Sequence, residues 1–195
     1  MSRVTTSNLT ADTSKPITLV SAVRDALRLA LTHALGGPNK RVLVILPPNQ
    51  AYTSFCSALQ SPLDDPTLTE AASSPEILSR IALKQCNGSI EIISLAVTVN
   101  TINPTVAPSL IILISPEELV GFPIITDTTT ATTTAASVLP ACLITLNTLL
   151  ALLCGAPFSP LIHFEFTNQN LLLSQECIGP IRAMLQRVEW PLTYK

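Results

Sequence analysis

Charged side chains are scarce in this sequence. Asp, Glu, Lys and Arg make up 12% of its 195 residues, whereas about a quarter is usual for soluble proteins. The eleven basic residues form no cluster, and the formal net charge is −2. Without a basic patch the chain has no surface suited to a phosphate backbone, so nucleic acid is not expected as a direct ligand. A surface short of charge favours a permanent protein partner over a free monomer.

Glycine is also rare, with six residues, and none stands in a nucleotide-binding arrangement such as GxGxxG or GxxxxGK[ST]. After the first apolar strand pattern, at 41–46, the chain continues with Pro47-Pro48-Asn49-Gln50. Two prolines remove two of the amide donors that a phosphate cradle at a strand end requires. We therefore expect no nucleotide cofactor at this junction.

The five cysteines follow no metal-binding or disulfide pattern. They lie far apart in apolar or helical segments, without CxxC or Cys/His spacing, at positions 56, 86, 142, 154 and 177. Such cysteines are typical of thiols in a reducing compartment. The first sixteen residues contain no apolar signal-peptide core and little arginine. These features predict a protein of the cytosol or nucleus that has no metal site.

The longest stretch without charge runs from Thr128 to Phe164. Its apolar centre must be covered by protein or by lipid. A helix from Pro140 to Cys154 would be about 22 Å long, short of the roughly 30 Å hydrocarbon core of a bilayer. It would also carry Asn147 near its middle, where lipid offers an amide no partner. We therefore expect a helix buried within protein, with membrane attachment through residues 137–161 as the alternative.

Helical and strand patterns alternate along the chain. Continuous apolar runs such as RVLVIL and SLIILI are typical of strands buried on both faces of a parallel sheet. We predict a three-layer, Rossmann-like α/β domain at 17–195, whose mostly parallel sheet has about four or five strands flanked by helices. Helices are expected at 18–35, 50–59, 75–86, 140–154 and 173–188, strands at 41–46, 90–99, 109–114 and 162–167, a flexible tail at 1–16, and loops at 61–74 and, Thr-rich, at 121–136.

Two places near strand ends offer groups for catalysis. Glu117 and Glu118 follow the strand predicted at 109–114, and His163 enters the last predicted strand. Adjacent carboxylates point in different directions, however, and Glu118 is placed to cap a helix by accepting from the Ser115 amide. A buried histidine usually makes one or two hydrogen bonds and does nothing further. We predict no catalytic residue, no cofactor and no metal; a small α/β enzyme with a site near Glu117 and His163 is the alternative.

The C-terminal residues offer a feature for binding a partner. The sequence ends with Glu189-Trp190-Pro191-Leu192-Thr193-Tyr194-Lys195, and Pro191 prevents the preceding helix from continuing. A projecting end would present a tyrosine ring, its hydroxyl and a free carboxylate, which together suit a pocket on another protein. We predict Thr193, Tyr194 and Lys195 as partner-binding residues, with a frayed end as the alternative.

Several segments together follow a recognisable order. They are the strand–helix pair at 40–59, the strand patterns at 90–99 and 109–114, the Leu139-Pro140-Ala141 opening of an apolar helix, the strand at 163–167 and the tail ending in Tyr194. In this order and local pattern the chain resembles the proteasome assembly chaperones, specifically the first subunit of their heterodimer. The resemblance implies a non-enzymatic protein that pairs with a sister chaperone and sits on the α-subunit ring of the 20S proteasome during its assembly.

Members of that family dock a C-terminal hydrophobic–tyrosine–any motif in a pocket between α-subunits. Tyr194 and Lys195 match its last two positions, whereas Thr193 stands where the motif has a hydrophobic residue. The chain is also short for the family. The resemblance implies an obligate hetero-oligomer in the cytoplasm or nucleus, with no nucleic acid or membrane; a structural subunit of another multiprotein complex is the further alternative.

Overall fold

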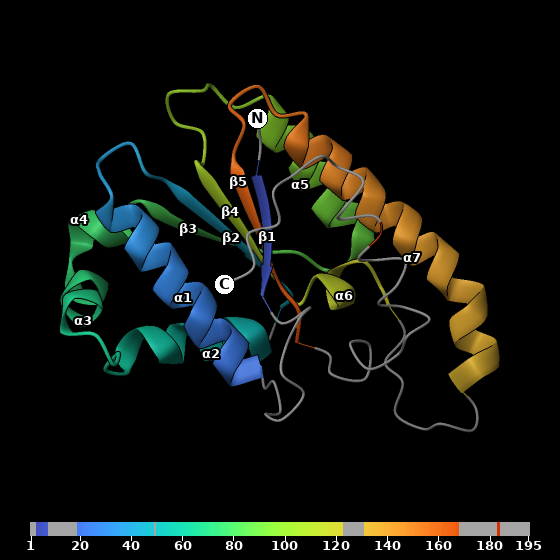
Figure 1. Ribbon diagram of the computed structural model, residues 1–195, viewed down its shortest axis with the longest axis horizontal. Helices are drawn as coiled ribbons and strands as arrows, with labels where there is room; N and C mark the ends of the chain where they lie inside the picture. The colour runs from blue at the N-terminus through green and yellow to red at the C-terminus, as the bar shows by residue number, and fades with distance from the viewer. Residues whose placement is uncertain (1–2, 8–18, 49, 123–130, 168–182, 184–195) are drawn as a thin grey trace.

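The computed structural model describes residues 3–7, 19–48, 50–122, 131–167 and 183. Within these ranges a five-stranded sheet, parallel throughout, lies between two layers of helices (Figure 1). The order across the sheet is β1-β5-β4-β2-β3. The predicted three-layer α/β class is therefore confirmed. The strands are β1 (Arg3–Ser7), β2 (Val42–Leu46), β3 (Ile81–Gln85), β4 (Leu110–Ile114) and β5 (Leu161–Glu165).

Four helices cover one face of the sheet, and two helices cover the other (Figure 1). On the first face are α1 (Leu19–Leu35), α2 (Gln50–Gln60), α3 (Pro66–Ser73) and α4 (Pro75–Leu78). On the second are α5 (Ser89–Asn100) and α7 (Ala131–Cys154), while the short α6 (Pro116–Leu119) follows β4. Among the described residues, none of the helices combines the length and the hydropathy that a membrane span requires.

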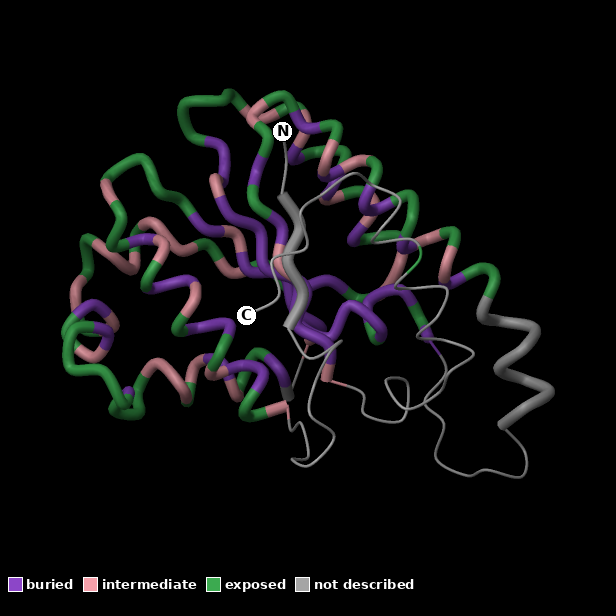
Figure 2. The backbone as a smooth tube through the Cα atoms, viewed as in Figure 1, coloured by how far each residue is buried: buried purple, intermediate pink, exposed green. Residues whose placement is uncertain are grey.

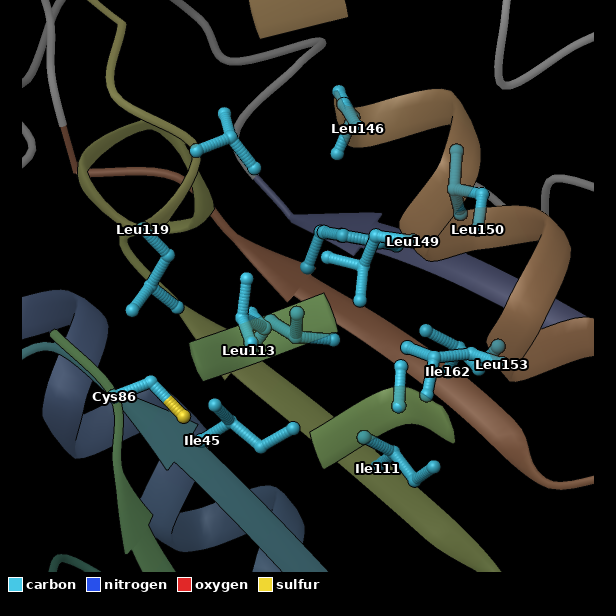
Figure 3. Close-up of a cluster of buried hydrophobic side chains, with 14 of the residues drawn as sticks. Ile45, Cys86, Ile111, Leu113, Leu119, Leu146, Leu149, Leu150, Leu153 and Ile162 are labelled. Atoms are coloured by element: carbon cyan, nitrogen blue, oxygen red, sulfur yellow. The ribbon is translucent and has the colours of Figure 1, made fainter. Parts of the chain in front are cut away.

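The central strand β4 explains how one sheet supports two cores. Its five residues are all buried, and successive side chains of a strand point to opposite faces. Leu110, Ile112 and Ile114 pack with α1 and its neighbours. Ile111 and Leu113 pack with α5 and α7, next to Leu149 (Figure 3). The apolar run at 109–114 thus forms a strand that is buried on both faces of the sheet, as its composition predicts.

Helix α1 confirms the prediction made from its apolar stripe. Seven residues of the stripe, four of them alanines, are buried against the sheet and α2. Small side chains let the helix approach the sheet closely. The helix ends before Gly37, whose φ of 143° is a conformation that L side chains rarely adopt.

Three predicted elements between β2 and β4 were wrong. Residues 90–99 form helix α5 rather than a strand: Ile92, Ala96 and Val99 are buried at helical spacing, despite a β-branched composition. The helix predicted at 75–86 stops after one turn, and the edge strand β3 follows. The predicted loop at 61–74 contains α3, where Asp65 caps the helix by accepting from the Thr67 amide at 2.8 Å.

Two further boundaries were wrong. Arg3–Ser7, assigned to the flexible tail, form β1 and pair with β5 along the edge of the sheet. Helix α7 begins at Ala131 rather than Pro140, so residues 131–136 belong to it and not to a Thr-rich loop. Pro140 lies inside the helix at an exposed position. Residues 123–130 and the last predicted helix, apart from residue 183, lie outside the described residues.

Candidate functional site

The β5 strand places two ionisable side chains next to the wholly apolar strand β4. Ile162, Phe164 and Phe166 belong to the core beneath α5 and α7, so His163 and Glu165 point to the α1 face. The Nε2 atom of His163 lies 3.1 Å from Oε2 of Glu165. Glu165 is completely buried. A carboxylate removed from water requires such a partner, because burying an unpaired charge is costly.

Helix α1 brings a second carboxylate near this pair. Burial raises the pKa of Asp25, and the charge of Glu165 raises it further, whereas Arg28, Arg24 and His163 act in the opposite direction. Asp25 itself keeps contact with solvent. Two carboxylates and an imidazole thus share one region, yet no group of His, Cys, Asp and Glu among the described residues could hold a metal ion.

A second polar cluster lies where β4 and β5 end. Ser115 Oγ is 2.6 Å from Thr167 Oγ1, and Thr167 donates both its hydroxyl and its amide to Glu117 Oε1, each at 2.8 Å. Glu117 is 3% exposed. This carboxylate therefore fastens the chain after β5 to the turn after β4, which is a structural task.

The capping role predicted for Glu118 was wrong. The Ser115 amide donates to the Glu165 carbonyl at 2.9 Å and so extends the sheet ladder. Ser115 adopts φ 50°, a left-handed conformation that is uncommon for serine. Glu118 is exposed, and burial of part of its side chain raises its pKa.

The two clusters do not form a nucleophile–base pair. His163 lies opposite Ile112 in the sheet, and Ser115 follows three residues later. At roughly 3.3 Å per residue, Ser115 is about 10 Å farther along the strand direction. A serine activated by histidine needs the two side chains within about 3 Å. Glu117 and His163, which the alternative hypothesis placed in one site, are thus held in separate clusters.

The outer side of α5 and α7 is a second candidate site, of a different kind. Ile90 is 85% exposed, Ile144 67% and Val97 49%. The other exposed residues of this surface carry no charge except Glu91, which accepts from the Asn87 amide at 2.8 Å. We call this surface the α5/α7 face; its exposed members are Ile90, Glu91, Ser94, Val97, Thr98, Pro140, Ala141, Ile144, Asn147, Thr148 and Ala151.

One hydrogen bond fixes how the two helices align. Both run antiparallel to the strands that they connect and are therefore parallel to each other. Near their C-terminal ends, Asn100 Nδ2 donates to the Leu152 carbonyl at 3.0 Å, between positions 52 apart in sequence. With equal rise per residue, Ile144 lies level with residue 92 (144 − 52), between Ile90 and Val97. The three exposed aliphatic side chains thus share one surface.

Sequence reasoning missed this face. The segment containing Ile90 and Val97 was read as a strand, so no outward side could be assigned, and α7 was expected to be buried all round. The available signal was the near absence of charge in both segments. The predicted partner-binding residues Thr193, Tyr194 and Lys195 lie outside the described residues.

Burial makes three of the four described cysteines, Cys86, Cys142 and Cys154, poorly suited to react as nucleophiles. Cys86 and Cys142 are buried, and all four described cysteines are reduced. Burial raises the pKa of Cys154 to about 12, so its thiolate is scarce at neutral pH. Cys142 Sγ lies 3.1 Å from the Gly121 carbonyl oxygen, to which it donates.

Comparisons with known proteins assign no family: no protein-family model matches the chain, and no curated protein matches its sequence. The resemblance to the proteasome assembly chaperones therefore stays a prediction.

Proposed function

We propose that this chain is a non-enzymatic protein-binding subunit that buries its α5/α7 face against a partner protein. The observation that supports the proposal is the coincidence of exposed aliphatic side chains and missing charge on that face. Burying a large aliphatic side chain is worth roughly 1.5–3 kcal/mol. The cores of protein interfaces are depleted of charged residues. A partner surface that is equally uncharged and rich in aliphatic or aromatic groups fits this face best.

The finer proposal concerns which partner it is. We propose a sister chaperone, with the heterodimer acting on the α-subunits of the 20S proteasome during ring assembly, in the cytoplasm or nucleus. This rests on the resemblance in element order. The segments at 42–46, 50–60 and 110–114 keep that order, whereas 90–99, which also entered the resemblance, is a helix. Thr193, Tyr194 and Lys195 are the residues proposed to contact the α-subunits.

A pair of matched variants tests the proposed face. Ile144→Lys places a charge at the centre of the α5/α7 face, and Val20→Lys places the same charge on α1. The two positions are equally exposed, at 67% and 66%, so neither change should unfold the protein. The tagged full-length chain is purified from cells, and co-purifying proteins are quantified by mass spectrometry. We expect Ile144→Lys to reduce a stoichiometric partner at least tenfold and Val20→Lys to retain it.

Equal retention of the partner by both variants would contradict the proposal. So would a wild-type chain that stays monodisperse and monomeric at high concentration. The finer proposal is tested by deleting Thr193 to Lys195: proteasome α-subunits should be lost while the sister chaperone is retained. Absence of proteasome subunits from the wild-type sample as well would reject the finer proposal and leave the α5/α7 interface standing.

An enzyme is the second candidate, and the buried pair of His163 and Glu165 favours it. Ionisable groups inside a fold often mark a reactive site, although structural pairs occur as well. A screen of metabolites for ligands that raise the melting temperature, run on wild type and on His163→Gln, separates the two. A metabolite that stabilises wild type alone would support the enzyme; no such metabolite would support the binding subunit.

A further inference from the structure

Ser61 stands in an accessible serine–proline dipeptide on the charged side of the molecule. It follows the last residue of α2, and Pro62 follows it. The side chain is exposed, and its hydroxyl donates to the Ser57 carbonyl at 3.0 Å. Serine followed by proline is the minimal recognition element of proline-directed kinases. Its exposure and the proline that follows it thus make Ser61 a candidate for phosphorylation. The charges around Ser61 decide whether a phosphate there would be bound or repelled.

Two arginines of α1 converge on the segment that begins with Ser61. Arg24 Nη2 donates to the Pro62 carbonyl at 3.0 Å. Arg24 Nη2 lies 3.5 Å from Asp64 Oδ1, and Arg28 Nη1 lies 3.7 Å from Asp64 Oδ2. The two arginines are one helical turn apart, so they share a face of α1. A double positive charge is therefore already assembled beside the dipeptide.

The present anion at this position is a weak competitor for those arginines. The Asp64 side chain is 71% exposed, and both of its ion pairs are long. Exposed ion pairs contribute little to stability, and their partners exchange readily. A phosphoserine carries nearly two negative charges and three strong acceptor oxygens. Room exists for it, because a groove of about 230 Å³ between α1 and α2 is lined by Arg24 and Ser61 together.

We propose that Ser61 is a phosphorylation site for a proline-directed serine kinase, and that Arg24 and Arg28 bind the phosphate. The kinase transfers the γ-phosphoryl group of ATP to Ser61 Oγ. The new oxygen–phosphorus bond forms as the bond between the γ-phosphorus and the departing ADP oxygen breaks, and the hydroxyl proton passes to the kinase's base. The product is an ionic clamp that ties the end of α2 to α1.

The other serine–proline dipeptides of the described residues lack this setting. Ser115 is buried. The hydroxyl of Ser74 caps α4 by accepting from the Ile77 amide. Ser159 is exposed but lies in a segment, 155–161, that contains no charged residue. Ser159 is therefore the matched control for accessibility without an arginine pair.

The dipole of α2 affects the stability of a phosphate at Ser61. Ser61 follows the C-terminal end of α2, where an added negative charge is unfavourable. The arginines must overcome this repulsion. With them, the phosphate should stabilise the fold; without them, it should destabilise it. The sign of the change in melting temperature therefore reports whether the arginines bind the phosphate.

The test uses the full-length chain, ATP and a recombinant cyclin-dependent kinase. Mass spectrometry should locate a phosphate on Ser61, lost in Ser61→Ala and retained in Ser159→Ala. At low salt the phosphorylated wild type should melt about 2–4 °C above the unmodified protein, and this gain should vanish near 1 M salt. In Arg24→Gln/Arg28→Gln the phosphate should lower the melting temperature, and in Arg24→Lys/Arg28→Lys most of the gain should return.

Two results would overturn the proposal. One is a kinase reaction that leaves Ser61 unmodified while Ser159 is labelled. The other is a phosphate-induced change in melting temperature that is the same in wild type and in the double glutamine variant. Encoding phosphoserine directly at position 61 allows the second comparison without depending on the kinase.

Discussion

The two helical layers of this protein pack alike on the inside and differ on the outside. Beneath both layers, fully buried aliphatic side chains meet the alternating residues of β4. Both layers also expose residues along their outer sides (Figure 2). Within α5 and the described part of α7, Glu91 is the single charged residue; within α1 to α4, charge is carried by Arg24, Asp25, Arg28, Glu70 and Glu76.

This difference distinguishes the residues that the fold requires from those that it does not. A sheet needs apolar cover on both faces, and each layer supplies it in the same way. Packing against the sheet does not constrain the residues on the outer sides. Their composition therefore indicates whether each outer side is in contact with solvent or with another protein. The α1–α4 layer forms ion pairs, such as those of Arg80 with Glu76 and of Arg24 with Asp64, as a solvated surface does. The α5/α7 face is depleted of charge, as the cores of protein interfaces are, which is why we propose that a partner covers it.

The largest expected effect tests whether the two layers are equivalent inside. Leu149→Ala on α7 and Leu27→Ala on α1 each remove a fully buried side chain. Each should lower the free energy of unfolding by about 2–5 kcal/mol, because transfer and cavity terms add. Urea denaturation measures both. A loss below about 1 kcal/mol for Leu149→Ala alone would mean that the α7 layer is loosely packed, which contradicts the account.

A smaller effect is expected at the carboxyl edge of the sheet, between the layers. Glu117→Ala removes the acceptor of the Thr167 amide and hydroxyl and should cost about 1–3 kcal/mol. Its exposed neighbour offers the control: Glu118→Ala should change stability by less than about 0.5 kcal/mol. Equal losses for the two variants would show that the buried carboxylate does not fasten β5.

The pH dependence of stability should come from the α1–α4 layer. His33 of α1 is hydrogen-bonded to Ser109, with Nε2 and Oγ 2.8 Å apart. Burial, aided by Lys40, lowers its pKa below the ordinary 6.5. The unfolded chain therefore binds the proton first, so stability is kept above about pH 6.5 and lost as the pH falls through that value. His33→Gln should flatten the stability profile between pH 7 and 5; an unchanged profile would contradict this.

The smallest effect belongs to Asp25, with the opposite sign. Burial, with help from Glu165, raises its pKa above the ordinary 3.8. The unfolded chain ionises first as the pH rises, so stability falls above about pH 3.8. Asp25→Asn should add a few tenths of a kcal/mol at pH 7, since exposed charges are screened, and nothing near pH 3. A destabilised variant at pH 7 would reverse this reading.

The sequence was sufficient where one element carries a long, uniform pattern. The stripe of α1 and the apolar runs of β2 and β4 each have one physical interpretation, and these elements were predicted to within about two residues. The segment at 90–99 misled because its β-branched residues favour strands, while its burial at positions 92, 96 and 99 is helical. At 90–99, tertiary packing outweighed the strand propensity of the individual residues. Edge strand β3 lacks an apolar run and left no signal.

The candidate sites were less accessible to sequence reasoning. Glu117 meets Thr167 fifty positions later, and no local pattern announces such a contact. The pair of His163 and Glu165 was within reach, because residues two apart on a strand share a face. The α5/α7 face required knowing which sides of two helices point outward, which only the fold provides.

The most direct test of the central claim is carbene footprinting of the chain, alone and in the complex isolated from cells. Labelling reports which side chains meet water. If the α5/α7 face is an interface, labelling at Ile90 and Ile144 should fall severalfold in the complex, while Val20 on the charged layer stays equally labelled. Unchanged labelling of Ile144 together with protection of Val20 would contradict the proposal that the α5/α7 face binds the partner.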